Sequence, residues 1–201
     1  CYGGPGGEEQ AAWLGGWVPG KEISVMPEDT GIEVTPGSGV ILQVHYNDSG
    51  EEGAAAQTSV DVQIADEVAW PGGIQPFTDL DWVEGGEMVI PAGSEGLEYS
   101  FTMSIPANLR LYSGGLHMHT LGQSGRLWVE RSDGEIEWLL SVPSWDFSWQ
   151  QSYWLEDPID FEAGDSLGVS CTFDNPDNTD VSWGEGTTDE MCLGLIYMTA
   201  R

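Results

Sequence analysis

The sequence predicts an all-β fold, an antiparallel β-sandwich of the jelly-roll type. Short runs that alternate between apolar and polar residues recur along the chain, and clusters of Gly, Pro, Asn and Asp separate them. Helix signals are scarce, and 28 of the 201 residues are glycine, which suits a fold with many turns. Strands of this kind bury one face each, so we expect two stacked sheets.

Six runs predict strands. In "LEYSFTMSI" at 97–105, Leu97, Tyr99 and Phe101 fall on one face and polar residues fall on the other. The remaining predicted strands are residues 39–46, 59–65, 125–131, 166–173 and 192–199. Between them, "SDGE" at 132–135 predicts a hairpin turn and "DNPDNTD" at 174–180 predicts a loop.

Two features predict a division of the chain near residue 70. The first forty residues are rich in Gly and Pro with few alternating runs, so we expect extended coil that leads into the strand holding His45. The stretch "EVAWPGGIQPF" at 67–77 contains two prolines and two glycines and predicts a linker. The predicted parts are therefore residues 1–70 and 71–201.

The charge is strongly acidic. Five Lys and Arg stand against 34 Asp and Glu, a formal net charge of −29, and Lys21 is the sole lysine. Nucleic acid and anionic membranes would be repelled, so neither is an expected partner. No stretch of 18 apolar residues predicts a membrane span. The acidic residues are spread along the chain without a calcium-loop pattern, so a solvated surface is the favoured interpretation, in a secreted, periplasmic or high-salt setting.

Three cysteines leave one unpaired if the other two form a disulfide. Cys171 and Cys192 lie on two predicted strands, and a bond between them would contribute about 3 kcal/mol by closing a loop of some 20 residues. Two reduced, buried thiols are the alternative, and they suit an extracytoplasmic chain less well. The third cysteine, Cys1, is expected to pair with a residue upstream of this sequence.

The sequence "GGLHMHTLG" at 114–122 predicts a metal site. The chain has three histidines, and two of them, His117 and His119, are one residue apart. On a strand such side chains project from the same face, so two imidazoles could bind one metal ion. The alternative is a pair of exposed or internally hydrogen-bonded histidines. Met191 in "TTDEMC" could be a third ligand, although a methionine more often packs in the core. Two imidazoles and a thioether favour copper, particularly Cu(I). Such a site would predict redox chemistry.

Ten tryptophans raise a different possibility. Four of them, Trp138, Trp145, Trp149 and Trp154, crowd the segment 137–154. Packing in the core and at sheet edges is the usual role of such residues, and a shelf for an aromatic ligand or a glycan is the alternative. One functional hypothesis is therefore an adhesion or glycan-binding sandwich in which the His pair is incidental.

Four motifs, in order, resemble the copper type II, ascorbate-dependent monooxygenases, the family of peptidylglycine α-hydroxylating monooxygenase and dopamine β-monooxygenase. They are "LQVHY" (42–46), "LHMHTLG" (116–122), "VSCTF" (169–173) and "GTTDEMC" (186–192). Seventy-two residues separate His45 from His117, and the same number separates His119 from Met191, as is typical of that family. The resemblance covers about residues 40–201.

The resemblance implies two jelly-roll domains with one copper ion each. His117, His119 and Met191 would be ligands of the second copper, where O2 binds and the substrate C–H bond is broken. Cys171 and Cys192 fall where the family has a disulfide. His45 matches one of three histidine ligands of the first copper, which accepts electrons from ascorbate. Residues 1–70 would then be the C-terminal remnant and linker of the first domain, and residues 71–201 the second domain.

The chain departs from the family pattern at two places. It contains no further histidine for the first copper, so we expect the missing copper domain to lie upstream. The peptide-hydroxylating branch binds its substrate's carboxylate at three positions that are Gly115, Leu193 and Leu195 in this chain. Because these residues offer neither charge nor hydroxyl, the sequence disfavours a peptide with a C-terminal glycine and favours a neutral or cationic small molecule.

The predicted function is a copper-dependent monooxygenase that hydroxylates an unactivated C–H bond with O2 and a reductant such as ascorbate. This chain would be its C-terminal, oxygen-activating part, which binds copper but turns over poorly alone. The alternative is a non-catalytic copper-binding module for storage, delivery or sensing on the same sandwich. A histidine pair encoded upstream would favour the enzyme.

Overall fold

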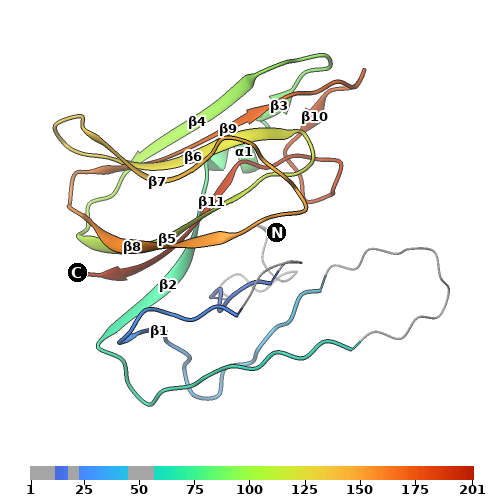
Figure 1. The fold of residues 1–201 in the computed structure, drawn as a ribbon. Helices are drawn as coiled ribbons and strands as arrows, with labels where there is room; N and C mark the ends of the chain where they lie inside the picture. Colours follow the sequence, from blue (N-terminus) through green and yellow to red (C-terminus); the bar gives the residue numbers. More distant parts are fainter. Residues whose placement is uncertain (1–11, 18–22, 45–56) are drawn as a thin grey trace.

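The structure is a computed structural model that describes residues 12–17, 23–44 and 57–201 (Figure 1). Cys1, Lys21 and His45 lie outside the described residues. The chain orders its elements as β1 (Thr30–Ile32), β2 (Trp70–Phe77), α1 (Leu80–Val83), β3 (Val89–Ile90), β4 (Leu97–Ser104), β5 (Leu109–His117), β6 (Gly122–Glu130), β7 (Ile136–Val142), β8 (Ser152–Phe161), β9 (Ser166–Phe173), β10 (Val181–Ser182) and β11 (Leu193–Ala200).

The strands form a sandwich of two main sheets, as the sequence predicted. The five-stranded sheet has the order β1-β2-β11-β5-β8, and the four-stranded sheet has the order β4-β9-β6-β7. Figure 1 shows the two sheets stacked, with a small β10-β3 ribbon at one end. The described strand pairs are antiparallel except that of β1 with β2, which is parallel. The fold is therefore an all-β, jelly-roll-type sandwich.

The core fills the space between the two sheets. Alternate residues of each strand point inward, which is why the period-two pattern of the sequence predicted the strands. Leu127 and Val169 from the four-stranded sheet meet Phe161 and Ile196 from the five-stranded sheet, and all four side chains are fully buried. Burial of each such side chain contributes roughly 1.5–3 kcal/mol, so this layer is the main source of stability.

Four of the six predicted strands are confirmed as β4, β6, β9 and β11, with the predicted turn at 132–135 and the loop at 174–180 between elements. The other two were wrong within the described residues: 39–44 and 59–65 form no strand. A strand needs a partner, and neither stretch pairs with one in the described part of the chain. Residues 59–65 have the alternating pattern of a strand, but their apolar residues Val60, Val62 and Ile64 are exposed.

The predicted linker at 67–77 was also wrong, because it contains β2 inside the five-stranded sheet. Its glycines made it resemble a linker, but Gly72 has a packing role. A Cβ atom added there would lie 2.5 Å from the Met198 carbonyl oxygen. The missing side chain thus lets β2 approach β11 closely. The division into residues 1–70 and 71–201 stays a prediction.

A charged network ties β8, the following turn and β6 together at one end of the sandwich. Arg131 Nη1 donates to Asp165 Oδ2 at 2.7 Å, and Arg131 Nη2 donates to the Glu137 carboxylate. The Asp165 carboxylate further accepts the backbone N–H groups of Ser132 and Glu162. Burial alone would raise the pKa of Asp165, but the hydrogen bonds from the Glu162 N–H and Arg131 lower it below its ordinary value.

Among the described residues, no helix is long and apolar enough to cross a membrane.

Asp165→Asn should lower the free energy of unfolding by about 2 kcal/mol at neutral pH, because it leaves Arg131 without its buried carboxylate. A lowered pKa in the folded state adds stability above the unfolded-state pKa, and this stability is lost as the pH falls. The difference from the wild type should therefore shrink below about pH 4. Urea unfolding across pH measures it, with the exposed Asp157→Asn as the control; a constant difference at all pH values would contradict the prediction.

Candidate functional site

The two neighbouring histidines lie at the C-terminal end of β5, an interior strand of the five-stranded sheet. His117 is the last residue of β5, and His119 lies two residues beyond it. The centroids of their rings are 5.1 Å apart and the ring planes are nearly perpendicular. Met118, between them, is fully buried in the core. As the i, i+2 spacing predicted, the two imidazoles project together while the residue between them points away.

Met191 is held next to this pair by the pairing of β5 with β11. Leu193 is the register partner of His117 in the antiparallel ladder. The same register, continued by two residues, brings Met191 level with His119. A backbone contact supports this placement, since His119 Nδ1 lies 2.9 Å from the Asp189 carbonyl oxygen. The Met191 side chain is buried, so its thioether sits inside the protein beside the histidine segment.

Both imidazoles are oriented by a hydrogen bond at Nδ1. His117 Nδ1 is 2.6 Å from Gln150 Oε1, and His119 Nδ1 faces the Asp189 carbonyl. Because both partners are carbonyl-type acceptors, Nδ1 carries the hydrogen in each ring and Nε2 carries the lone pair. This is the arrangement in which an imidazole can act as a metal ligand through Nε2 with its orientation fixed from behind.

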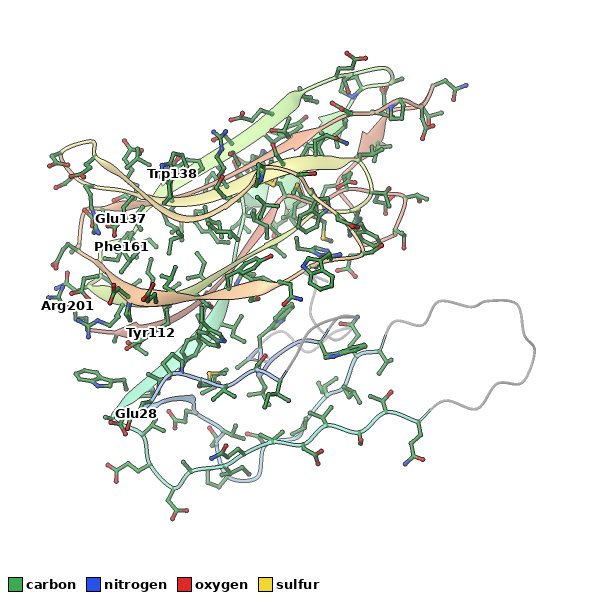
Figure 2. All side chains as sticks on the ribbon, viewed as in Figure 1. Glu28, Tyr112, Glu137, Trp138, Phe161 and Arg201 are labelled. Carbon is green, nitrogen blue, oxygen red and sulfur yellow. A yellow bond between two sulfur atoms is a disulfide. The ribbon has the colours of Figure 1, made fainter. Side chains whose placement is uncertain are left out.

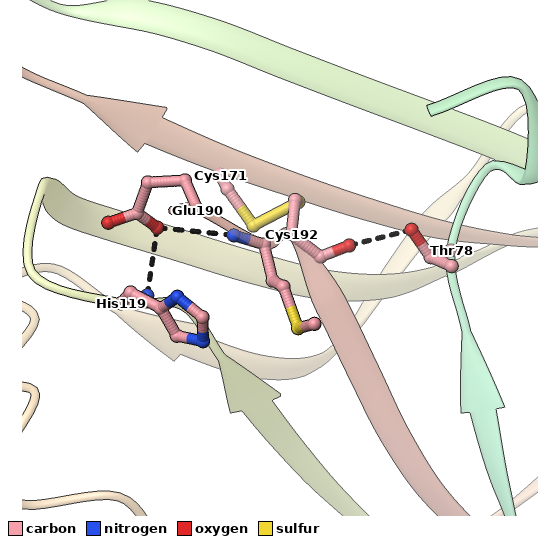
Figure 3. The surroundings of a disulfide bond; sticks show 6 residues. Thr78, His119, Cys171, Glu190 and Cys192 are labelled. Carbon is pink, nitrogen blue, oxygen red and sulfur yellow. Dashed lines mark hydrogen bonds between the residues drawn. A yellow bond between two sulfur atoms is a disulfide. The ribbon is translucent and has the colours of Figure 1, made fainter. Parts of the chain in front are cut away.

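Glu190 is a site residue that the sequence reasoning did not identify. Its side chain is fully buried, and its carboxylate accepts the backbone N–H groups of His119 at 2.8 Å and Met191 at 3.3 Å (Figure 3). It also accepts the backbone N–H of Leu121 at 2.6 Å. One side chain thus ties the histidine segment to the methionine segment. Burial raises the pKa of Glu190, and the N–H groups of Leu121 and His119 oppose that rise.

The loop between β7 and β8, residues 143–151, forms a wall beside the histidines. The Trp145 indole N–H donates to the His119 carbonyl at 3.0 Å. The Phe147 ring meets the His119 ring edge-on, with centroids 6.0 Å apart. Gln150, which contacts His117 Nδ1, comes from the same loop. The sequence predicted either packing or a glycan shelf for the tryptophans of this segment. Their clustering suggested a common role, but it did not indicate a contact with His119.

A disulfide fixes the start of β11. Cys171 of β9 and Cys192 are bonded, so the bond joins the four-stranded sheet to the residue next to Met191 (Figure 3). The Thr78 hydroxyl donates to the Cys192 carbonyl at 2.8 Å from the other side. The sequence left bonded or reduced cysteines open, and the structure has the bonded form.

The three positions expected to line a substrate pocket differ in exposure. Leu193 is buried, and Leu195, which pairs with Gly115, is only partly buried. A Cβ atom at Gly115 would lie 2.8 Å from Ser152 Oγ. A longer side chain at position 115 would therefore meet β8, so the structure has little room there for a charged group.

Two observations concern possible sites elsewhere in the molecule. No group of three or more His, Cys, Asp or Glu side chains that could hold a metal ion occurs in the described part of the chain. A cavity of about 190 Å³ lies at the opposite end of β5, lined by Trp70, Arg110, Tyr112, Thr199, Ala200 and Arg201. It contains none of the candidate ligands and is not part of this site.

Comparison with known proteins gives one family. Residues 83–199 match the family described as copper type II ascorbate-dependent monooxygenase, C-terminal domain. This segment is more than half of the chain and includes both histidines, both bonded cysteines and Met191.

The curated relatives are distant and longer. The human DBH-like monooxygenase protein 1 is 27% identical over 206 residues, covering 92% of this chain and 32% of the relative. The Drosophila melanogaster MOXD1 homolog 1 is 24% identical, covering 90% and 27%. The Caenorhabditis briggsae tyramine beta-hydroxylase is 24% identical, covering 92% and 33%. The chain therefore spans about a third of the length of these relatives.

A solved structure of a family 35 carbohydrate-binding module from an environmental isolate also matches. It is 12% identical with a TM-score of 0.26, over 55% of this chain and 74% of the module. A similarity this low bears on neither fold nor function.

Glu190→Gln should lower the free energy of unfolding by about 2–4 kcal/mol, because the new amide would turn an N–H donor toward backbone N–H groups that need an acceptor. Urea unfolding followed by tryptophan fluorescence measures the loss. The exposed Glu156→Gln is the matched control and should change stability by less than about 0.5 kcal/mol. Equal stability of Glu190→Gln and the wild type would show that the carboxylate does not hold the two segments together.

Proposed function

Because the chain belongs to the copper type II ascorbate-dependent monooxygenases, we propose that it binds one copper ion through His117, His119 and Met191. The observation that carries the proposal is the juxtaposition of two imidazoles, 5.1 Å apart between ring centroids, with a buried thioether on the adjoining segment. In each ring the hydrogen bond at Nδ1 leaves Nε2 as the nitrogen for coordination.

The chemistry of these donors fits copper. Imidazole nitrogens and a thioether sulfur suit Cu(I), whereas Zn²⁺ prefers thiolate, imidazole and carboxylate, and Ca²⁺ takes oxygen ligands. When bound, copper would supply the one-electron redox chemistry that O2 needs to react with a C–H bond. The protein's own contribution is orientation: Gln150 and the Asp189 carbonyl hold the rings, and Glu190 holds the backbone beneath them.

We propose that the complete enzyme hydroxylates an unactivated C–H bond. One oxygen atom of O2 is inserted into the bond to give an alcohol, and the other leaves as water after taking up two protons and two electrons. A reductant such as ascorbate supplies those electrons. The loop at 143–151 serves this chemistry by placing the rings of Trp145 and Phe147 beside His119, where they keep water away from one side of the site.

Residues 1–70 are proposed to belong to a first, electron-accepting copper domain, with His45 as one of its ligands. Support comes from the part of this region that the structure describes, where apolar side chains are unusually exposed. Among them are Val40, Val60, Val62 and Ile64, which are 62–86% exposed. An upstream jelly-roll domain would cover such residues. The isolated chain is then expected to bind copper but to turn over poorly.

The proposed substrate is a neutral or cationic small molecule. Position 115 is a glycine pressed against Ser152, and Leu193 and Leu195 are apolar, so these positions offer no charge for a carboxylate. The net charge of −29 would also attract cations and repel anions. One relative is named a tyramine beta-hydroxylase, and we propose an amine for this chain as well. The Cys171–Cys192 disulfide supports a secreted or periplasmic location, where such bonds persist.

Anaerobic titration with Cu(I), followed by copper X-ray absorption, tests the site. We expect one copper per chain with two nitrogen scatterers and one sulfur scatterer. His117→Ala, His119→Ala and Met191→Leu should each weaken copper binding by roughly a hundredfold or more, and Met191→Leu should also remove the sulfur signal. Copper bound without sulfur would exclude Met191 as a ligand.

Two variants serve as matched controls. His45→Ala removes the remaining histidine and should leave this copper site intact. Met103→Leu removes a methionine on β4, a strand of the other sheet, and should keep the sulfur scatterer. Absence of stoichiometric copper in the wild type would refute the proposed site, whatever the variants do.

A further inference from the structure

The outer face of the four-stranded sheet carries rows of hydroxyl and aromatic side chains. Leu127, Val129, Leu167 and Val169 point into the core, so their neighbours along β6 and β9 point outward. The strand registers align these outward residues across the sheet. One row is Thr102, Gly168, Trp128 and Trp138, and the next is Ser100, Ser170, Arg126 and Ser141.

A glycine makes the centre of this face flat. A Cβ atom added to Gly168 would lie 2.1 Å from Trp128 Cε2 and 2.5 Å from Trp128 Nε1. The Trp128 indole therefore lies over the Gly168 backbone, in the space that a side chain would fill. The Trp128 side chain is half-buried, so part of its ring remains exposed on this face.

Trp138 forms a side wall next to this floor. Its ring centroid is 6.0 Å from that of Trp128, and the planes are inclined by 62°. The Trp138 side chain is 54% exposed and lies on β7 (Figure 2). The Arg126 guanidinium packs over the Trp138 ring at 5.7 Å from its centroid. The three side chains make an aromatic corner with a cationic hydrogen-bond donor at its rim.

The charge of this face differs from that of the whole chain. The aligned outward positions of the four strands include Glu98, Glu130 and Arg126 but are otherwise mainly Ser, Thr, Gly and Trp, whereas the chain as a whole carries a net charge of −29. Among the described arginines, Arg110, Arg131 and Arg201 form ion pairs with carboxylates, whereas Arg126 packs on Trp138. Arg126 thus lies on a face that has few charges.

We propose that this face binds a neutral polysaccharide chain. An aromatic ring exposed on a flat surface suits the apolar C–H face of a sugar, and Ser, Thr and Arg side chains can hydrogen-bond its hydroxyl groups. Strands lie about 4.8 Å apart, so a row across four strands spans roughly 14 Å, enough for a short oligosaccharide. Anionic glycans and a second copy of this chain are disfavoured, because the net charge would repel both.

The inference does not depend on copper, since the candidate metal ligands belong to the end of the five-stranded sheet. The test is native gel electrophoresis of the whole chain in gels containing laminarin, hydroxyethylcellulose, xylan or galactomannan, with polygalacturonate as the anionic comparison. At least one neutral polysaccharide should retard the wild type. Trp138→Ala should weaken that binding about tenfold, because the side wall of the corner is lost.

Two further variants complete the test, one that displaces Trp128 and one that serves as a control on the other sheet. Gly168→Ala should also weaken binding, because the new methyl group lifts the Trp128 ring from the sheet. Trp154→Ala removes an indole of similar exposure from the other sheet and should bind as the wild type does. Circular dichroism checks that each variant is folded. The proposal is overturned if no neutral polysaccharide retards the chain, if Trp138→Ala binds unchanged, or if sedimentation shows that Trp138 instead mediates a dimer.

Discussion

The geometry of the candidate site depends on one buried carboxylate. Glu190 accepts backbone N–H groups from His119 and Leu121, which are 71 and 69 residues away in the sequence, and from the adjacent Met191. The turn after β5 and the start of β11 are therefore held as a unit. Burying a carboxylate is costly unless its oxygens are satisfied, and here the N–H groups satisfy them. The positions of His119 and Met191 therefore follow from a residue that need not touch a ligand.

Other contacts around the site act on the same two segments from different directions. The Cys171–Cys192 bond holds the start of β11 from the core side, and Thr78 holds the Cys192 carbonyl. Gln150 and Trp145 hold the histidine segment from the loop at 143–151. These contacts come from three parts of the sandwich, namely β9, the residue after β2 and the loop at 143–151. The site is thus a product of the whole fold, which pre-orients side chains that could otherwise adopt many rotamers.

The sequence predicted the sandwich and the strands β4, β6, β9 and β11, because a half-buried strand leaves a period-two pattern. It missed β2, where Pro71 and Gly72 resemble a linker, and it predicted strands at 59–65 where no partner strand is described. The histidine pair and Met191 were predicted as ligands from spacing and family resemblance, and this assignment stays a prediction. Glu190 and Gln150 were missed, because their roles arise from contacts between distant segments, which leave no periodic signal in a single sequence.

For the proposed copper site, the disulfide next to Met191 has a consequence for the order of maturation. Cys192 directly follows Met191, so the methionine is fixed in place once the bond to Cys171 has closed. A chain that met copper while still reduced would offer two thiols beside the histidines, and thiolates bind Cu(I) more strongly than a thioether does. Oxidation before metal loading would remove that competitor. The order of disulfide formation and metal delivery would then decide which sulfur binds copper at the proposed site.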